Sequence, residues 1–425
     1  MSVWSKQYPN APLHEPAGAW FVNRKDELNL LWKWACKIPD KGSRSITGLR
    51  RTGKSSLIAK LYNRLYFEQE RVMPIYITLA RYLHRTEPMT SEEFVDIFFE
   101  GAVRSYLTFQ YKRPEFQQDI TLDLAELHII AQELADETAL KWFQRYYRTD
   151  TLSRVPSHNR VQWAINFLKS HAYLKPQPMV IMIDEFQLLT EVKMMDDGRV
   201  TNITGSFQRA SESWDAPLLV SGSSMYALRE KALGGLLSGR FGQTHIGPLE
   251  PEHAVHMVFL LGEHLGIPVT EEFSVGIAVA AEGFPFLIES ILRSSSHLVQ
   301  RFPDTSVIQY ILEYELSDNQ GSLREYYYQE YGKYLAALSD DYTICEVLHW
   351  ITDDTFELPE ITASRIANIT GLDCSDVQES LNTLYGLDII QRKIGMIYSP
   401  PRDPLMRIYL NSYYGKRAYG KRAKV

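Results

Sequence analysis

The chain is poor in cysteine and has no long apolar run. Its 425 residues contain three cysteines, which lie far apart and form no spaced pair of metal ligands: Cys36, Cys345 and Cys374. This argues against a disulfide-rich scaffold and favours reduced thiols. No apolar run approaches the roughly 20 residues of a membrane helix, and the first residues lack the apolar core of a secretion signal. We therefore expect a cytoplasmic protein without a membrane span.

The chain also lacks an excess of positive charge. It has 45 Lys and Arg against 52 Asp and Glu, a net charge of −7, which argues against a basic nucleic-acid binder as a whole. The cations are unevenly distributed, because a basic tail at 413–425 contains five of them and no acidic side chain. Such a tail contacts phosphates or forms a solvated end, and both interpretations stay open.

The most specific feature present is a glycine-rich loop between a short strand pattern and a helical pattern. It reads Gly48-Leu49-Arg50-Arg51-Thr52-Gly53-Lys54-Ser55-Ser56. Gly48 and Gly53 allow a positive-φ backbone that turns N–H groups toward phosphate oxygens. Lys54 would bind the β- and γ-phosphates, and the Ser55 hydroxyl would complete the shell of a Mg²⁺ ion. The loop therefore predicts a site for a nucleoside triphosphate such as ATP.

Acidic and hydroxyl side chains follow two apolar strand patterns. The most apolar of these, at 179–183, ends in Asp184 and Glu185, and the next ends shortly before Ser223 and Ser224. Parallel strands bring such ends to the edge of the sheet where the phosphate loop lies. Asp184 would hold Mg²⁺ directly or through water, and Glu185 would polarise the attacking water. Ser223 and Ser224 would orient that water or contact the γ-phosphate, or simply form a turn.

A single cation precedes the last strand pattern of this region. Arg240 lies in a glycine-containing loop just before a weak strand at 244–246. There it would reach the γ-phosphate of its own nucleotide or that of a neighbouring subunit, which would require a homo-oligomer. An ordinary surface arginine is the alternative.

The order of patterns predicts an α/β fold with a parallel sheet of the P-loop NTPase type, followed by a helical lid and a winged-helix domain. The length suits two or three domains. We expect a helical insertion at about 85–172 within the α/β core. The predicted parts are an N-terminal arm at 1–20, the core at 21–250, the lid at 251–335, the winged helix at 336–412 and the basic tail at 413–425.

Several short motifs together resemble the archaeal-type ATPases, a prokaryotic group close to the AAA+ and STAND nucleotide switches and to the initiator ATPases of replication origins. The resemblance covers about residues 20–300, and the winged helix is its usual companion. The motifs that carry it are Phe21-Val22-Asn23-Arg24 with Glu27-Leu28, the phosphate loop, Ile183-Asp184-Glu185, Gly222-Ser223-Ser224, Gly239-Arg240 and Gly283-Phe284-Pro285.

The resemblance implies positions for the nucleotide base. Phe21, Val22 and Arg24 would lie near the adenine, and Pro285 of the lid would also approach it. Arg293 on the following helix would serve as a second sensor of the nucleotide. With the residues above, it implies a Mg²⁺-dependent ATPase whose lid closes on ATP binding and reopens after hydrolysis.

Two functions follow from these patterns. The first is an ATP-driven switch or remodeller that acts on a protein or nucleic-acid partner. The second is a DNA-binding regulator or initiator with slow nucleotide turnover. The third helix of the winged-helix pattern is rich in acids, such as Asp376 and Glu379, whereas the wing has Arg392 and Lys393. DNA contact and protein contact through this domain therefore both stay open.

Overall fold

The computed structural model describes residues 8, 10–14, 21–37, 42–83, 85, 87–151, 155–174, 177–299, 306–318, 321–332, 341–352, 360–393 and 395–411. The chain forms two compact units. The first unit comprises Met1–Gly18 and Arg24–Gly247, and the second comprises Ala19–Asn23 and Pro248–Val425. The predicted basic tail and most of the predicted arm lie outside the described residues.

The first unit is built on a five-stranded sheet whose strands are all parallel, in the order β2-β4-β7-β1-β8. Every residue of β4 and β7 is buried, as a parallel sheet covered on both faces requires. This confirms the predicted α/β class with a parallel sheet. The strands are β1 (Arg44–Gly48), β2 (Met73–Thr78), β4 (Met179–Asp184), β7 (Leu218–Ser221) and β8 (Gly242–Ile246).

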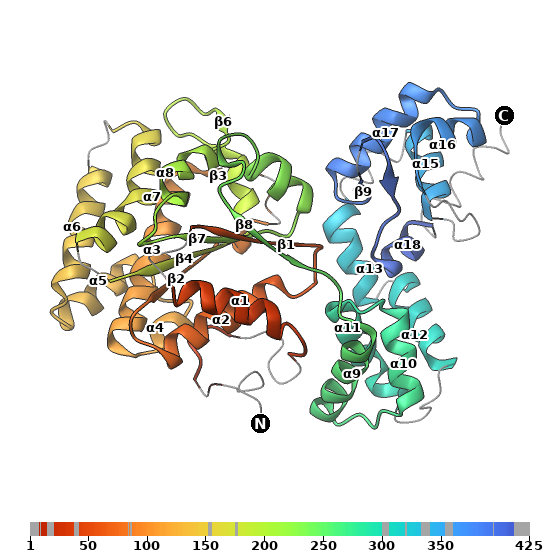
Figure 1. Cartoon of the computed structure of the whole chain (residues 1–425), viewed down its shortest axis with the longest axis horizontal. Coiled ribbons are helices and arrows are strands. Elements are labelled where there is room, and N and C mark those ends of the chain that lie inside the picture. Colours follow the sequence, from red (N-terminus) through yellow and green to blue (C-terminus); the bar gives the residue numbers. More distant parts are fainter. Residues whose placement is uncertain are drawn as a thin grey trace. The chain divides into compact units, whose positions relative to one another are not determined.

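Helices cover both faces of this sheet and one of its edges. Figure 1 shows α1 (Lys25–Ala35) and α2 (Lys54–Glu68) on one face, with α7 (Ser157–Leu174) and α8 (Gln208–Ser211) on the other. The long helix α3 (Ser91–Tyr111) packs against the edge strand β2. Its Ser105 Oγ accepts a hydrogen bond from the Tyr76 N–H at 3.0 Å. The helix thus satisfies a backbone donor that an edge strand would otherwise expose.

The helical segment between β2 and β4 shares its core with the sheet. Phe99 of α3 stacks on Tyr146 with ring centroids 4.4 Å apart, and both belong to the same buried cluster as Ile181 of β4. The predicted insertion is therefore packed into the first unit by apolar side chains. Besides α3 and α7, its helices are α4 (Glu115–Gln118), α5 (Leu124–Glu133) and α6 (Glu137–Thr151).

Short elements connect the main strands of the first unit. A small sheet contains β3 (Met89–Thr90), β5 (Val192–Lys193) and β6 (Val200–Thr201), with β5 in the middle. Short helical turns follow the sheet strands where the chain reverses. They are η3 (Ala80–Tyr82), η4 (Phe186–Thr190), η5 (Thr204–Phe207), η6 (Ala227–Ala232) and η7 (Gly235–Leu237).

The second unit is mainly helical. Three helices and an antiparallel strand pair stand near its end, in the order expected for a winged helix, although that assignment stays a prediction. Across the described parts of both units, no helix combines the length and apolar character needed to span a bilayer. The elements are α9 (Pro251–Leu265), α10 (Glu271–Ala280), α11 (Pro285–Val299), α12 (Ser306–Ser317), α13 (Ser322–Tyr327), η8 (Tyr328–Gly332), α15 (Tyr342–Thr352), α16 (Ala363–Thr370), α17 (Cys374–Gly386), β9 (Gln391–Arg392), β10 (Tyr398–Ser399) and α18 (Pro404–Leu410).

One polar contact ties the middle of the second unit to its last helix. The Tyr327 hydroxyl lies 2.9 Å from both carboxylate oxygens of Asp403. Asp403 also caps α18, because its carboxylate accepts the N–H groups of Leu405 and Met406 at 3.0 Å. Burial raises the pKa of the Asp403 carboxyl, although these hydrogen bonds act in the opposite direction.

Candidate functional site

The glycine-rich loop connects the end of β1 to the start of α2. Gly53 has a φ of 95° and precedes Lys54, the first residue of α2, and Arg51 is also left-handed with a φ of 63°. Gly48 does not have a positive φ, so that part of the prediction is wrong. Glycine is required there because a Cβ would collide with the carbonyl oxygen of Ile246 on the neighbouring strand β8.

The ammonium group of Lys54 lies within the curve of the loop. Its Nζ donates hydrogen bonds to the carbonyl oxygens of Gly48 at 3.0 Å and Leu49 at 2.6 Å. The Thr52 hydroxyl closes the loop from the other side, with its Oγ1 donating to the Leu49 carbonyl at 2.9 Å. Lys54 is buried, so its charge is concentrated at the start of α2, where the helix dipole also favours an anion.

Asp184 at the end of β4 meets the hydroxyl group that the sequence predicts as its metal partner. Ser55 Oγ donates a hydrogen bond to Asp184 Oδ2 at 2.8 Å, although the two residues are 129 positions apart. The other oxygen, Oδ1, accepts from the Ser221 hydroxyl and from the Glu185 N–H at 3.1 Å. Hydroxyl and carboxylate oxygens are the donors that Mg²⁺ prefers, so this pair fits the predicted ion.

The electrostatics of Asp184 agree with such a role. Burial, followed by the negative charge of Glu185, raises the pKa of the Asp184 carboxyl above its ordinary value. The hydrogen bonds from Ser221 and Ser55 and the charge of Lys54 lower that pKa in part. Two buried acids side by side are therefore costly in the protein alone, and a divalent cation would relieve this repulsion.

Glu185 is held in an uncommon conformation. It is the residue after β4, has a φ of 62°, and is only 7% exposed. Its Oε2 accepts hydrogen bonds from Gln187 Nε2 at 2.5 Å and from the Ser223 N–H at 3.1 Å. Ser224 has a local turn contact, in which its Oγ accepts the Ala227 N–H at 3.0 Å.

Two residues at this edge were missed by sequence reasoning. Ser221 is the last residue of β7 and binds Asp184, and Gln187 lies two positions beyond Glu185. Their signals are weak, because a serine after a strand and a glutamine after an acid are common. Only the pairing of β7 with β4 shows which side chains meet.

Arg24 lies against the phosphate loop. Its Nη2 donates to the Thr52 carbonyl at 3.3 Å and to the Gly247 carbonyl, and its guanidinium pairs with Glu27 at 3.5 Å. A buried arginine that binds two backbone carbonyls fixes the position of the loop relative to the end of β8. Its predicted proximity to an adenine base stays a prediction.

Three other predicted base contacts lie in the second unit. Phe21 and Val22 fall within its segment Ala19–Asn23, and Pro285 is the first residue of α11. Arg293, on the same helix, pairs with Glu289 at 2.9 Å. The roles of these residues toward a nucleotide therefore stay predictions. In the loop itself, Arg50 is partly buried, Arg51 is exposed and Ser56 is partly buried within α2.

Arg240 precedes β8 and lies at the opposite end of the strands from the phosphate loop. Strand β8 runs parallel to β1 with Gly242 opposite Arg44 and Ile246 opposite Gly48. The length of the strand, about 13 Å from Gly242 to Ile246, therefore separates Arg240 from the loop. Its guanidinium pairs with Glu212, and its Nε donates to the Leu236 carbonyl at 2.8 Å. Contact with the nucleotide of its own chain, one of the predicted alternatives, is thus wrong.

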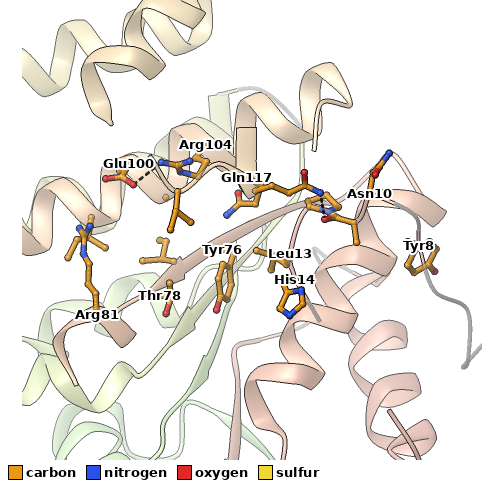
Figure 2. A pocket seen from close by; sticks show the side chains of 17 residues that line it. Tyr8, Asn10, Leu13, His14, Tyr76, Thr78, Arg81, Glu100, Arg104 and Gln117 are labelled. Carbon is orange, nitrogen blue, oxygen red and sulfur yellow. Dashed lines mark hydrogen bonds and ion pairs between the residues drawn. The ribbon is translucent and has the colours of Figure 1, made fainter. Parts of the chain in front are cut away.

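A cavity of about 980 Å³ lies beside β2, and no residue of the phosphate loop lines it (Figure 2). Tyr76 and Thr78 of β2 line it opposite Arg104 of α3, and a strap of residues 10–14 forms a further wall. The strap is bound to α2, because Asn63 exchanges two hydrogen bonds with the backbone of Leu13, at 3.0 and 2.9 Å. None of the predicted site residues lines this cavity.

These features together define a P-loop NTPase fold. The loop strand β1 lies between β7 and β8, and the strand that ends in the two acids is separated from it by β7 alone. The acids thus face the phosphate loop across one strand. The predicted resemblance to archaeal-type AAA+ ATPases is confirmed at the level of the fold by the solved structures that follow.

Two solved structures share this fold over nearly their whole length. One is a Walker-type ATPase of Pyrococcus abyssi, with a TM-score of 0.58 and 19% identity, covering 92% of this chain and 96% of that chain. The other is the ORC2 protein of Aeropyrum pernix in complexes with ADPNP and ADP, with a TM-score of 0.50 and 12% identity, covering 94% and 95%. No protein-family model and no curated protein matches the sequence. At these identities the likeness shows the fold alone.

Proposed function

We propose that this chain binds ATP with Mg²⁺ and hydrolyses it. The observation that supports the proposal best is the hydrogen bond of 2.8 Å between Ser55 Oγ and Asp184 Oδ2. Lys54 directly precedes the first of these residues, and Glu185 directly follows the second. A phosphate-binding cation, two magnesium ligands and a general base are thus gathered at one edge of the sheet.

Each residue has one task in the proposed reaction. The N–H groups of the loop and Lys54 hold the phosphates, and Ser55 and Asp184 hold the ion. Mg²⁺ supplies charge neutralisation at the phosphate oxygens when it is bound. Glu185 accepts a proton from the attacking water, since a carboxylate next to the metal site is placed for general-base catalysis.

The test is a phosphate-release assay with purified full-length chain, ATP and Mg²⁺. Lys54→Ala should abolish binding of a fluorescent ATP analogue. Glu185→Gln should retain binding and lose most hydrolysis, by about 10²- to 10⁴-fold. Glu137→Gln is a matched control, because that carboxylate is exposed on α6, paired with Lys141, and should leave both measurements unchanged. Normal hydrolysis by Glu185→Gln would refute the assignment of the base.

We further propose that nucleotide turnover drives a conformational switch that acts on a protein or nucleic-acid partner. The support is the division of the chain into two compact units, of which the first contains the loop and both acids. Small-angle scattering with ADP and with a non-hydrolysable ATP analogue tests this idea. Identical scattering profiles in the two nucleotide states would contradict it.

Arg240 is proposed to act on the nucleotide of a neighbouring subunit in a homo-oligomer. Its place at the far end of β8 from its own loop supports this, because a residue that acts between subunits need not reach the nucleotide of its own chain. Mixing Arg240→Ala subunits with Lys54→Ala subunits should restore activity in part, because each supplies what the other lacks. No recovery together with a monomeric mass would contradict the proposal.

DNA binding through the predicted winged helix is the alternative function. The exposed face of α17 presents Asp376, Glu379 and Asn382, and acids there oppose contact with phosphates. Arg392 on β9 is exposed and lies over the Tyr385 ring at 5.1 Å. A gel shift across a range of salt concentrations, with and without ATP, distinguishes the two functions. Absence of binding in every nucleotide state would rule out the DNA-binding regulator.

A further inference from the structure

Gln187 makes the closest polar contact with the proposed catalytic base. Its Nε2 donates to Glu185 Oε2 at 2.5 Å and to Ser223 Oγ at 3.2 Å. The Ser223 N–H donates to the same Glu185 oxygen at 3.1 Å. Gln187 and Ser223 therefore hold one carboxylate oxygen between the turn after β4 and the end of β7.

The second oxygen of Glu185 is left for another partner. Within the described part of the chain, Oε1 of Glu185 has no hydrogen bond, whereas Oε2 has two donors. A general base needs one oxygen with a lone pair that faces the water, and an anchored second oxygen fixes its direction. The arrangement thus orients the carboxylate and keeps one of its oxygens available.

The side-chain amide of Gln187 is closely packed against the backbone after β7. Gly222 lies against its carbonyl, and a Cβ at position 222 would collide with Gln187 Oε1. That oxygen is buried and has no hydrogen-bond partner among the described residues. An unpaired buried carbonyl destabilises the fold, so the favourable contacts of Nε2 must offset this cost. The side chain is therefore held by its donor end, the end that binds Glu185.

The backbone of Glu185 supports the same conclusion. A φ of 62° is unfavourable for a residue with a side chain and persists only where surrounding contacts determine it. The Glu185 N–H bonds to Asp184 Oδ1 at 3.1 Å, and its carboxylate bonds to Gln187 and Ser223. Strained residues fixed from both ends gather at functional sites.

We infer that Gln187 is a positioning residue for ATP hydrolysis, which acts by anchoring one carboxylate oxygen of Glu185. This inference rests on the proposed ATPase function. Gln187 acts through Glu185 and has no role in holding the nucleotide. Its removal should therefore slow the chemical step and leave nucleotide affinity unchanged.

The first experiment measures kcat, KM and ATP-analogue affinity for Gln187→Ala. We expect kcat to fall about 10- to 100-fold, because a misplaced catalytic group costs that much, with KM and affinity within twofold of wild type. Gln69→Ala is the matched control. Gln69 also uses its amide as a donor, to the carbonyls of Leu65 and Val72 at the far end of α2. The Gln69→Ala substitution should reduce thermal stability and leave kcat unchanged.

The second experiment combines substitutions. In a Glu185→Gln background, adding Gln187→Ala should change the residual single-turnover rate less than about twofold, because a residue that acts through Glu185 has nothing left to position. Gly222→Ala, whose Cβ displaces the amide, should lower kcat in the same way, and adding Gln187→Ala to it should cause no further loss.

Three results would overturn the inference. The first is an unchanged or higher kcat for Gln187→Ala. The second is a loss of rate from Gln187→Ala that is as large in the Glu185→Gln background as in the wild-type background. The third is a loss of kcat in Gln69→Ala as large as that in Gln187→Ala. A wild-type chain that releases no phosphate would overturn the proposed function and this inference together. An active wild type with a fully active Gln187→Ala variant would overturn the role of Gln187 alone.

Discussion

Replacing Asp184 with asparagine should stabilise the fold while it removes nucleotide binding. The carboxylate accepts three hydrogen bonds, from Ser55, Ser221 and the Glu185 N–H. Asparagine has a single acceptor oxygen, so about one of these bonds is lost, at about 1 kcal/mol. The substitution also removes the buried negative charge of Asp184 beside Glu185. Burying such a charge costs several kcal/mol in desolvation, and the attraction of Asp184 to Lys54 offsets only part of that cost. We therefore expect a net gain of about 1–2 kcal/mol, as is common when a strained site is relieved.

The increase in the free energy of unfolding of Asp184→Asn over wild type should grow as the pH rises. The pKa of Asp184 is raised above the ordinary 3.8 in the folded chain, so the folded chain binds this proton more tightly than the unfolded chain does. Wild-type stability then falls as pH rises from 3.8 to the folded pKa, and stays lower above it. The advantage of Asp184→Asn should therefore be small near pH 4 and full at neutral pH.

Urea unfolding in EDTA, followed by circular dichroism between pH 4 and pH 8, measures this difference. Saturating Mg²⁺ and ATP should reverse the order of stability, because a ligand at 100 times its Kd adds about 2.7 kcal/mol to wild type and nothing to the variant. A variant less stable than wild type at pH 7 in EDTA would refute the reasoning about the buried acids.

Three further substitutions test other parts of the structure. Asn63→Ala leaves the backbone N–H and carbonyl of Leu13 without partners, so the strap over the cavity should become sensitive to limited proteolysis, with a loss of about 2–4 kcal/mol in urea unfolding. Unchanged proteolysis would show that the strap is held elsewhere. Tyr327→Phe should cost the second unit about 1–3 kcal/mol at neutral pH and less at acid pH, because its hydroxyl stabilises the ionised form of Asp403; equal losses at both pH values would contradict this. Gly48→Ala should weaken binding of an ATP analogue and leave the melting temperature nearly unchanged, since its Cβ collides with β8 beside the loop. Normal affinity would show that β8 moves to accommodate the Cβ.

Much of the fold could be predicted because its signals are local. The apolar strand before Asp184 and the spacing from Gly48 to Ser55 lie within short stretches of sequence, and the structure has strand β4 and the loop at those positions. Each side chain there also has a chemical role that few other arrangements supply. The parallel sheet followed from the alternation of strand and helix patterns.

The parts that could not be predicted depend on strand pairing. Whether Arg240 lies near the loop of its own chain is decided by the direction of β8 relative to β1, and nothing within the 239–242 stretch records it. The contact between Ser221 and Asp184 arises from the pairing of β7 with β4 in the same way. Gly48 was assigned the wrong reason, because its constraint comes from Ile246, a residue about two hundred positions away.

Helix α2 has an anchor at each of two points along its length. Its first residue, Lys54, binds the loop carbonyls, and Asn63, nine residues later, holds the strap that walls the cavity beside β2. At 1.5 Å per residue the two points are about 13 Å apart on one rigid rod. A shift of α2 at its loop end would therefore also move the strap, because the loop and the wall of the cavity are attached to the same helix.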